Sequence, residues 1–178
     1  MSKNRKGFTL VEIIIVIAII AVLAAAIFVA VDPARRIQES NNARRWSDVT
    51  TMLDAVIKNQ ADNEGTLHAE VSAITADEFV IIGTTDDDDG LCASETTADA
   101  ACSNVATATG TADCVDLSEL GSKYLAAVPT DPKNGSDADT SYFITRDANN
   151  AVTIGSCDEE GEGSGGTEED APVIELTR

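Results

Sequence analysis

The stretch FTLVEIIIVIAIIAVLAAAIFVAV, residues 8 to 31, decides how this chain of 178 residues is organised. It is a run of 24 positions in which Glu12 is the only charged residue. At about 1.5 Å per helical residue, such a run is long enough to cross the hydrocarbon part of a bilayer. The sequence therefore predicts a membrane-spanning helix over residues 8 to 31.

Glu12 is the unusual residue of this helix. Placing a carboxylate inside lipid costs about 2.5 to 3.5 kcal/mol on insertion scales, so a retained one indicates a function and needs a partner. A carboxylate that reaches the membrane surface along the helix is the alternative. A cleaved secretory signal ending at Ala24-Ala25-Ala26 is disfavoured, because the apolar run exceeds the roughly 7 to 15 residues of such signals.

The segment KGFTLVEIIIVIAIIAVLAAAI, residues 6 to 27, resembles the class III signal of type IV prepilins and pseudopilins. The resemblance implies that a prepilin peptidase cuts between Gly7 and Phe8 on the cytoplasmic side and methylates the new amino group of Phe8. Residues 1 to 7 would then be a leader peptide. The resemblance also implies that Glu12 pairs with the N-terminus of a neighbouring subunit during assembly.

Residues 32 to 64 are predicted to continue the helix as an amphipathic segment. Pro33 favours the first turn of a helix with Asp32 as its N-cap, so we expect a break there. Apolar residues then recur at spacings of three and four, which predicts one stripe packed against a sheet. The stripe consists of Trp46, Val49, Met52, Leu53, Val56 and Ile57. Gly65 is expected to end the helix in the left-handed C′ conformation.

A basic collar follows the apolar run. It consists of Arg35, Arg36, Arg44 and Arg45. We hypothesise that in a filament the collar faces acidic surfaces of neighbouring subunits, which would make assembly sensitive to salt. Anchoring at the membrane interface is the alternative.

Residues 65 to 178 are predicted to form one acidic globular unit. They contain 24 Asp and Glu residues but only four Lys and Arg residues. This balance disfavours nucleic-acid binding, because that affinity depends on positive side chains neutralising phosphates. Short apolar or alternating stretches predict strands at 79 to 82, 141 to 146, 151 to 155 and 172 to 177, with a hairpin turn at 147 to 150.

The expected fold class is α+β. A long N-terminal helix, membrane-spanning in its first half and amphipathic in its second, would pack on a small antiparallel β-sheet. The segment SKYLAAVPTDPKNG, residues 122 to 135, followed by Tyr142, resembles a segment of pseudopilins and related small pilins. Pro129 and Pro132 stiffen it and Asn134-Gly135 indicates a turn, so we expect it to brace the sheet.

Four cysteines follow the apolar run, and none belongs to a C-x-x-C pair. An even number of cysteines beyond a membrane segment indicates two disulfides rather than a metal site. Three pairings are possible. The preferred one joins Cys92 to Cys102 and Cys114 to Cys157.

Two acidic segments complete the chain. The run from Asp86 to Gly90 invites a calcium interpretation, but its spacing is not that of an EF-hand, so a solvated loop is favoured and no cofactor is expected. Residues 158 to 170 have the composition of a flexible acidic linker.

The expected function is that of a structural subunit of a type IV pilus or pilus-like filament. Its partners would be other copies and related pilins, the prepilin peptidase, the inner-membrane assembly machinery and, before assembly, membrane lipid. The assembled chain would lie at the cell surface. No nucleophile–base pair is recognisable, so the chain is not expected to be an enzyme. The alternative is a permanently anchored single-pass surface protein with an acidic binding head, which would keep residues 1 to 7.

Overall fold

The computed structural model describes residues 7–83, 114–137, 139–161 and 171–178. The chain forms two compact units, one ending at Ile37 and one from Gln38 to Arg178, and each is described by itself. Most of the predicted leader, two of the cysteines and the acidic run at 86 to 90 lie outside the described residues. The predicted division of the chain at residues 7, 31 and 64 stays a prediction.

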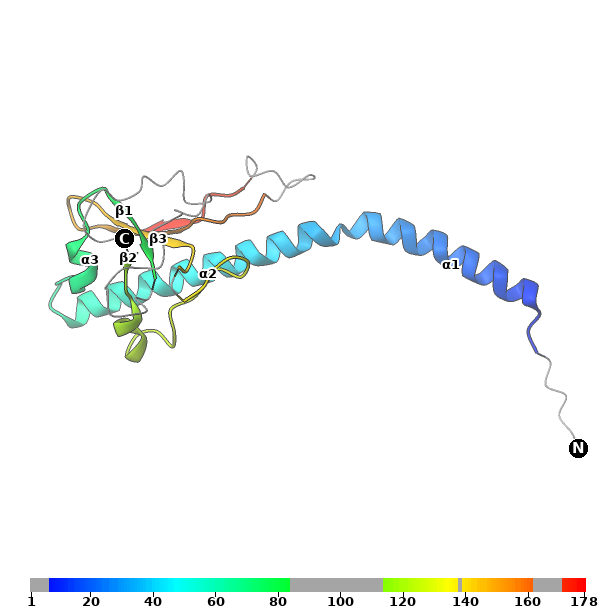
Figure 1. Cartoon of the computed structure of the whole chain (residues 1–178), viewed down its shortest axis with the longest axis horizontal. Coiled ribbons are helices and arrows are strands. Elements are labelled where there is room, and N and C mark those ends of the chain that lie inside the picture. The colour runs from blue at the N-terminus through cyan, green and yellow to red at the C-terminus, as the bar shows by residue number, and fades with distance from the viewer. Residues whose placement is uncertain (1–6, 84–113, 138, 162–170) are drawn as a thin grey trace, which may run out of the picture. The chain divides into compact units, whose positions relative to one another are not determined.

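Helix α1, Leu10–Val31, dominates the first unit (Figure 1). Every one of its residues is exposed, so the helix has no packing partner within its unit. Within the described part of the chain, the helical stretch Leu10–Asp62 is the one that is long and apolar enough to cross a membrane. The apolar surface of α1 is therefore left to contact lipid or other helices.

The helix is interrupted at Asp32, as predicted. Asp32 takes the left-handed conformation with φ 42°, and helix α2, Pro33–Asp62, begins directly after it. The Asp32 carboxylate accepts a hydrogen bond from the backbone nitrogen of Arg35 at 3.5 Å, which is the N-cap arrangement. Pro33 has no amide hydrogen, so the first helical position loses no donor.

From Gln38 onward, α2 supplies the helical side of the core of the second unit. Its buried apolar residues are Val49, Met52, Leu53, Ala55 and Val56. These residues confirm most of the predicted stripe. The prediction for Trp46 is wrong, because its side chain is 39 % exposed. Arg45 is buried instead, since it lies four residues before Val49 and therefore on the same helical face.

The end of α2 differs slightly from the prediction. Both Glu64 and Gly65 are left-handed, with φ of 57° and 88°. The Gly65 nitrogen donates to the carbonyl of Gln60 at 2.8 Å, a bond typical of a Schellman ending in which Glu64 is C′ and Gly65 is C″. A short helix, α3 at Ala69–Ala73, follows.

The second unit contains a five-stranded sheet in the order β2-β1-β3-β4-β5. Its strands are β1 Phe79–Ile82, β2 Cys114–Val115, β3 Tyr142–Arg146, β4 Val152–Ser156 and β5 Glu175–Thr177. Each of the four predicted stretches contains a strand. The predicted hairpin turn joins β3 to β4, and the Asp147 amide donates to the carbonyl of Ala151 at 2.9 Å. The α+β class is therefore confirmed.

The sheet is mixed, whereas the sequence predicted an antiparallel one. Strand β2 pairs in parallel with β1, while the other neighbouring strands pair antiparallel. A parallel pair needs a connection of a dozen or more residues, and the long segment between Ile82 and Cys114 supplies it. With only two residues, β2 is too short to show an alternating pattern. It leads to a 3-10 helix, η2, at Ser118–Ser122.

The core of the second unit lies between α2 and one face of the sheet (Figure 1). Alternate strand residues point to this face and pack with the helix, as the pleat of a sheet requires. They are Val80, Ile82, Tyr142, Ile144, Val152 and Ile154. On the other face, Phe79 and Phe143 make an edge-to-face ring contact with centroids 5.4 Å apart.

Candidate processing and assembly site

Gly7 and Phe8 lie in non-helical backbone directly before α1. The side chain of Phe8 is 84 % exposed, and no atom lies within 4 Å of the place where a Cβ on Gly7 would stand. The bond between these residues is therefore open on the side from which an enzyme must approach the backbone. A glycine before this bond removes the remaining side-chain obstacle.

Thr9 and Glu12 form a capping box at the start of α1. The backbone nitrogen and the hydroxyl of Thr9 donate to Glu12 Oε2 at 2.8 and 2.9 Å, and the Glu12 nitrogen donates to Thr9 Oγ1 at 3.2 Å. These bonds satisfy two helix-terminal amides. Within the described residues no cation pairs with Glu12, so its carboxylate has hydrogen bonds but no counter-ion.

Only two of the four cysteines of the predicted disulfides lie in the described part of the chain. Cys114 begins β2 and Cys157 directly follows β4, so both lie in the second unit. Cys92 and Cys102 fall outside the described residues. Both pairings stay predictions, and peptide mapping without reduction would decide them.

Arg45, like Trp46, lies elsewhere than the sequence predicted. Its side chain is fully buried, and its Nε and Nη2 atoms contact Oδ2 and Oδ1 of Asp131 at 2.6 and 3.1 Å. It therefore cannot belong to a collar that faces neighbouring subunits. Arg44 remains 58 % exposed beside Asp48. The signal that could have found the burial of Arg45, though not its partner, is its position on the same helical face as Val49.

Asp131 organises the segment that resembles pseudopilins. Its Oδ1 atom accepts hydrogen bonds from the backbone nitrogens of Lys133 and Asn134 at 2.8 and 3.1 Å. The Gly135 nitrogen donates to the Asp131 carbonyl at 3.2 Å. A Cβ on Gly135 would overlap the Asp131 backbone, so this position requires glycine. The turn therefore holds the Asp131 carboxylate toward Arg45.

Glu160, in the segment after β4, contacts the same arginine. Glu160 Oε2 lies 3.3 Å from Arg45 Nη1 and accepts a hydrogen bond from Asn41 at 2.7 Å. Lys133 Nζ contacts its other oxygen at 3.3 Å. Burial raises the pKa of Glu160, but the hydrogen bond from Asn41 and the nearby Lys133 and Arg45 charges outweigh it. The pKa of Glu160 is therefore lowered.

A second polar contact joins the sheet to α2. The Tyr142 hydroxyl donates to Asp48 Oδ2 at 3.0 Å. Burial raises the pKa of Asp48, and burial with the nearby Asp48 charge raises the pKa of Tyr142. The tyrosine therefore stays a neutral donor to this carboxylate.

Metal binding finds no support in the described part of the chain, where no three His, Cys, Asp or Glu side chains gather around one point. His68 lies 3.4 Å from Glu119 through Nε2, while its buried Nδ1 has no partner. The run at 86 to 90 considered for calcium is outside the described residues.

Comparison with known proteins gives one match. Residues 2–28 match the family described as the prokaryotic N-terminal methylation motif. No curated protein and no solved structure matches the chain. The matched segment contains Gly7, Phe8 and Glu12, and it supports the resemblance carried by residues 6 to 27.

Proposed function

We propose that this chain, a type IV pilin-like protein that carries the N-terminal methylation motif of prepilins, is a structural subunit of a type IV pilus or a related filament. The observation that carries the proposal is the match over residues 2–28. The matched segment includes most of α1, and the exposed apolar residues of this helix are free to contact lipid or the helices of other subunits. Prepilin peptidase removes the leader at Gly7–Phe8, and Phe8 becomes the methylated N-terminus. Helix α1 holds the subunit in the membrane until it joins the filament at the cell surface.

In the filament, α1 packs against α1 helices of other subunits. Moving an apolar helix from lipid to helix contacts gives little hydrophobic gain, because lipid tails are as apolar as leucine. Packing and polar contacts must therefore favour the assembled state and choose its register. Glu12 is the only charged residue within the apolar run, so it is the residue suited to this role.

Glu12 acts as the register contact because no positive side chain of the described residues pairs with its carboxylate. Thr9 donates two hydrogen bonds to the Glu12 carboxylate, but it does not neutralise the negative charge. Cleavage creates an amino group at Phe8, and the amino group of a neighbouring subunit neutralises Glu12 when the helices are correctly aligned. Misaligned packing would bury an unpaired carboxylate at a cost of several kcal/mol.

The test compares Glu12→Ala with Ile13→Ala in the full chain. Glu12→Ala is expected to insert and be cleaved but to give few filaments, because the register contact is missing. Ile13→Ala, at the adjacent exposed position, is the control and should assemble like the natural chain. The measurement is the amount of the chain in sheared surface filaments. Normal filaments from Glu12→Ala would overturn the register role, and absence of the natural chain from filaments would overturn the proposed function.

No catalytic role and no cofactor is proposed for the second unit. Its partners in this proposal are other copies of the chain and related pilins, with the peptidase and the inner-membrane machinery acting before assembly. A permanently anchored surface protein would share α1 but would keep the leader.

A further inference from the structure

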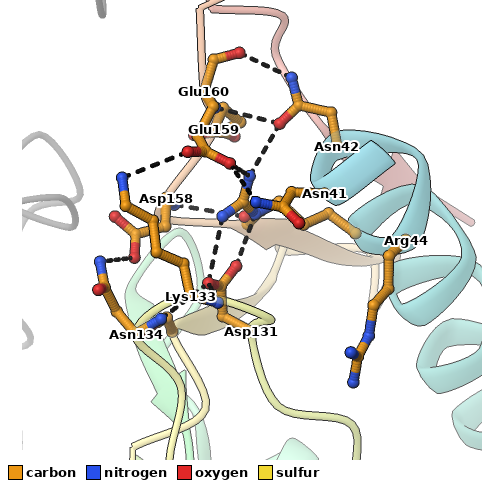
Figure 2. A network of polar contacts seen from close by, with 12 residues as sticks. Asn41, Asn42, Arg44, Asp131, Lys133, Asn134, Asp158, Glu159 and Glu160 are labelled. Atoms are coloured by element: carbon orange, nitrogen blue, oxygen red, sulfur yellow. Dashed lines mark hydrogen bonds and ion pairs between the residues drawn. The ribbon is translucent and has the colours of Figure 1, made fainter. Parts of the chain in front are cut away.

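One buried polar cluster connects three separate parts of the second unit, and an apolar core alone does not need it. The Arg45 cluster consists of Asn41, Asn42, Arg45, Asp131, Lys133 and Glu160 (Figure 2). Its first three members lie on α2. Asp131 and Lys133 lie in the loop before β3, and Glu160 lies after β4.

The contact with the loop is directional. Arg45 and Asp131 have no exposed side-chain surface and meet through two parallel contacts of 2.6 and 3.1 Å. A planar guanidinium matches a carboxylate in this way only over a narrow range of orientations. Burial lowers the pKa of Arg45, but the bonds to Asp131 outweigh it and the pKa is raised, so the arginine is charged.

The contact with the segment after β4 is equally specific. Asn42, which is 1 % exposed, donates to the Glu160 carbonyl at 2.7 Å and accepts from the Glu160 nitrogen at 3.1 Å. The same Asn42 oxygen accepts from Arg45 Nη1 at 2.9 Å. Arg45 thus lies between two segments. It pairs with Asp131 in the loop before β3, and the adjacent Asn42 binds the backbone of Glu160 after β4.

These contacts add a directional constraint to the packing of the apolar stripe on the sheet. Turning α2 by one residue is a rotation of about 100°, which would withdraw Arg45 from Asp131 as well as turn the apolar stripe away from the sheet. Asp131 would then remain buried without its cation, an arrangement that is strongly unfavourable. Apolar contacts have no such directional requirement.

We propose that Arg45 is a positioning residue that sets the rotation and register of the globular unit on α2, so that every head in a filament has the same orientation. This inference rests on the proposed function, because a filament needs identical orientation in each subunit. The buried pair of Arg45 and Asp131 carries no net charge, and the exposed Lys133 balances Glu160 at the edge of the cluster.

The test replaces the ion pair without leaving a buried charge unpaired. In Arg45→Met with Asp131→Asn, the methionine fills the volume and the asparagine oxygen still accepts from the loop amides, while the cluster keeps zero net charge. Arg45→Lys keeps the charge but loses the planar fork. Arg44→Met, at the exposed neighbouring position, is the control. The full chain is compared by thermal melting in detergent and by imaging of filaments.

We expect the double variant to melt near the natural chain, since buried ion pairs replaced as a pair often cost little stability. Its filaments should be lost or show blurred head density, whereas the Arg44→Met filaments remain ordered. Ordered heads in the double variant would overturn the proposal.

If the double variant unfolds, Arg45→Lys is the deciding variant, and disordered heads in a stable Arg45→Lys protein support the positioning role. If both variants unfold, the cluster is only a stabilising contact and the proposal fails. If the natural chain forms filaments, the proposed function holds even when the positioning role of Arg45 fails.

Discussion

Asp131 both accepts hydrogen bonds from the turn that follows it and pairs with Arg45. The turn allows this only because Gly135 brings its backbone against that of Asp131. Pro129 and Pro132 predicted a stiff segment that braces the sheet. The carboxylate between them could not be assigned a role from sequence, because its partner lies 86 positions away along the chain.

Gly135→Ala is expected to destabilise the second unit by about 3 kcal/mol, the upper part of the range for overpacking, because the added methyl group meets backbone atoms that cannot move aside. Urea unfolding of the full chain in detergent measures the change. Gly121→Ala is the matched control, since nothing lies within 4 Å of its added Cβ, and should stay within about 0.5 kcal/mol. Equal effects at the two positions would contradict this account of the turn.

At the scale of elements, α2 shows what periodicity can and cannot predict. Val49, Met52 and Val56 were predictable because apolar residues spaced by three and four must share a face. Trp46 was misplaced because it lies three residues before Val49 and so fits the spacing, while the buried position one residue earlier belongs to Arg45. The burial of a charged residue can be predicted only when its partner is known, and the partner is identified by the tertiary structure. Strand β2 was missed for a similar reason, since pairing with β1 defines it.

The link between α2 and the segment after β4 is expected to weaken in acid. The pKa of Glu160 is lowered from its ordinary value of 4.5, so its ionised form stabilises the fold above about pH 4.5. This contribution is lost as the pH falls through the lowered pKa. Glu160→Gln should therefore be less stable than the natural chain at neutral pH, and the difference should shrink in acid.

Urea unfolding of the full chain over a pH series measures this difference. Glu175→Gln, at an exposed position of β5, is the control and should follow the natural chain at every pH. A difference between Glu160→Gln and the natural chain that stayed constant into acid would show that the Glu160 charge does not stabilise the folded unit.

For the whole molecule, the two units differ in how much of their structure the sequence predicts. The helix of the first unit could be predicted from sequence, because its signal is local: an unbroken apolar run. The second unit has a net acidic composition and a sheet whose strands were largely predictable. The contacts that hold that sheet to α2 were not, since Arg45, Asp48 and Glu160 each find their partner far along the chain.

The N-terminus of the chain recovered from cells tests the central claim most directly. Mass spectrometry of its N-terminal peptide should show a chain that begins at Phe8 with a methylated amino group. A chain that still carries residues up to Gly7 would contradict processing by prepilin peptidase, and with it the role as a filament subunit.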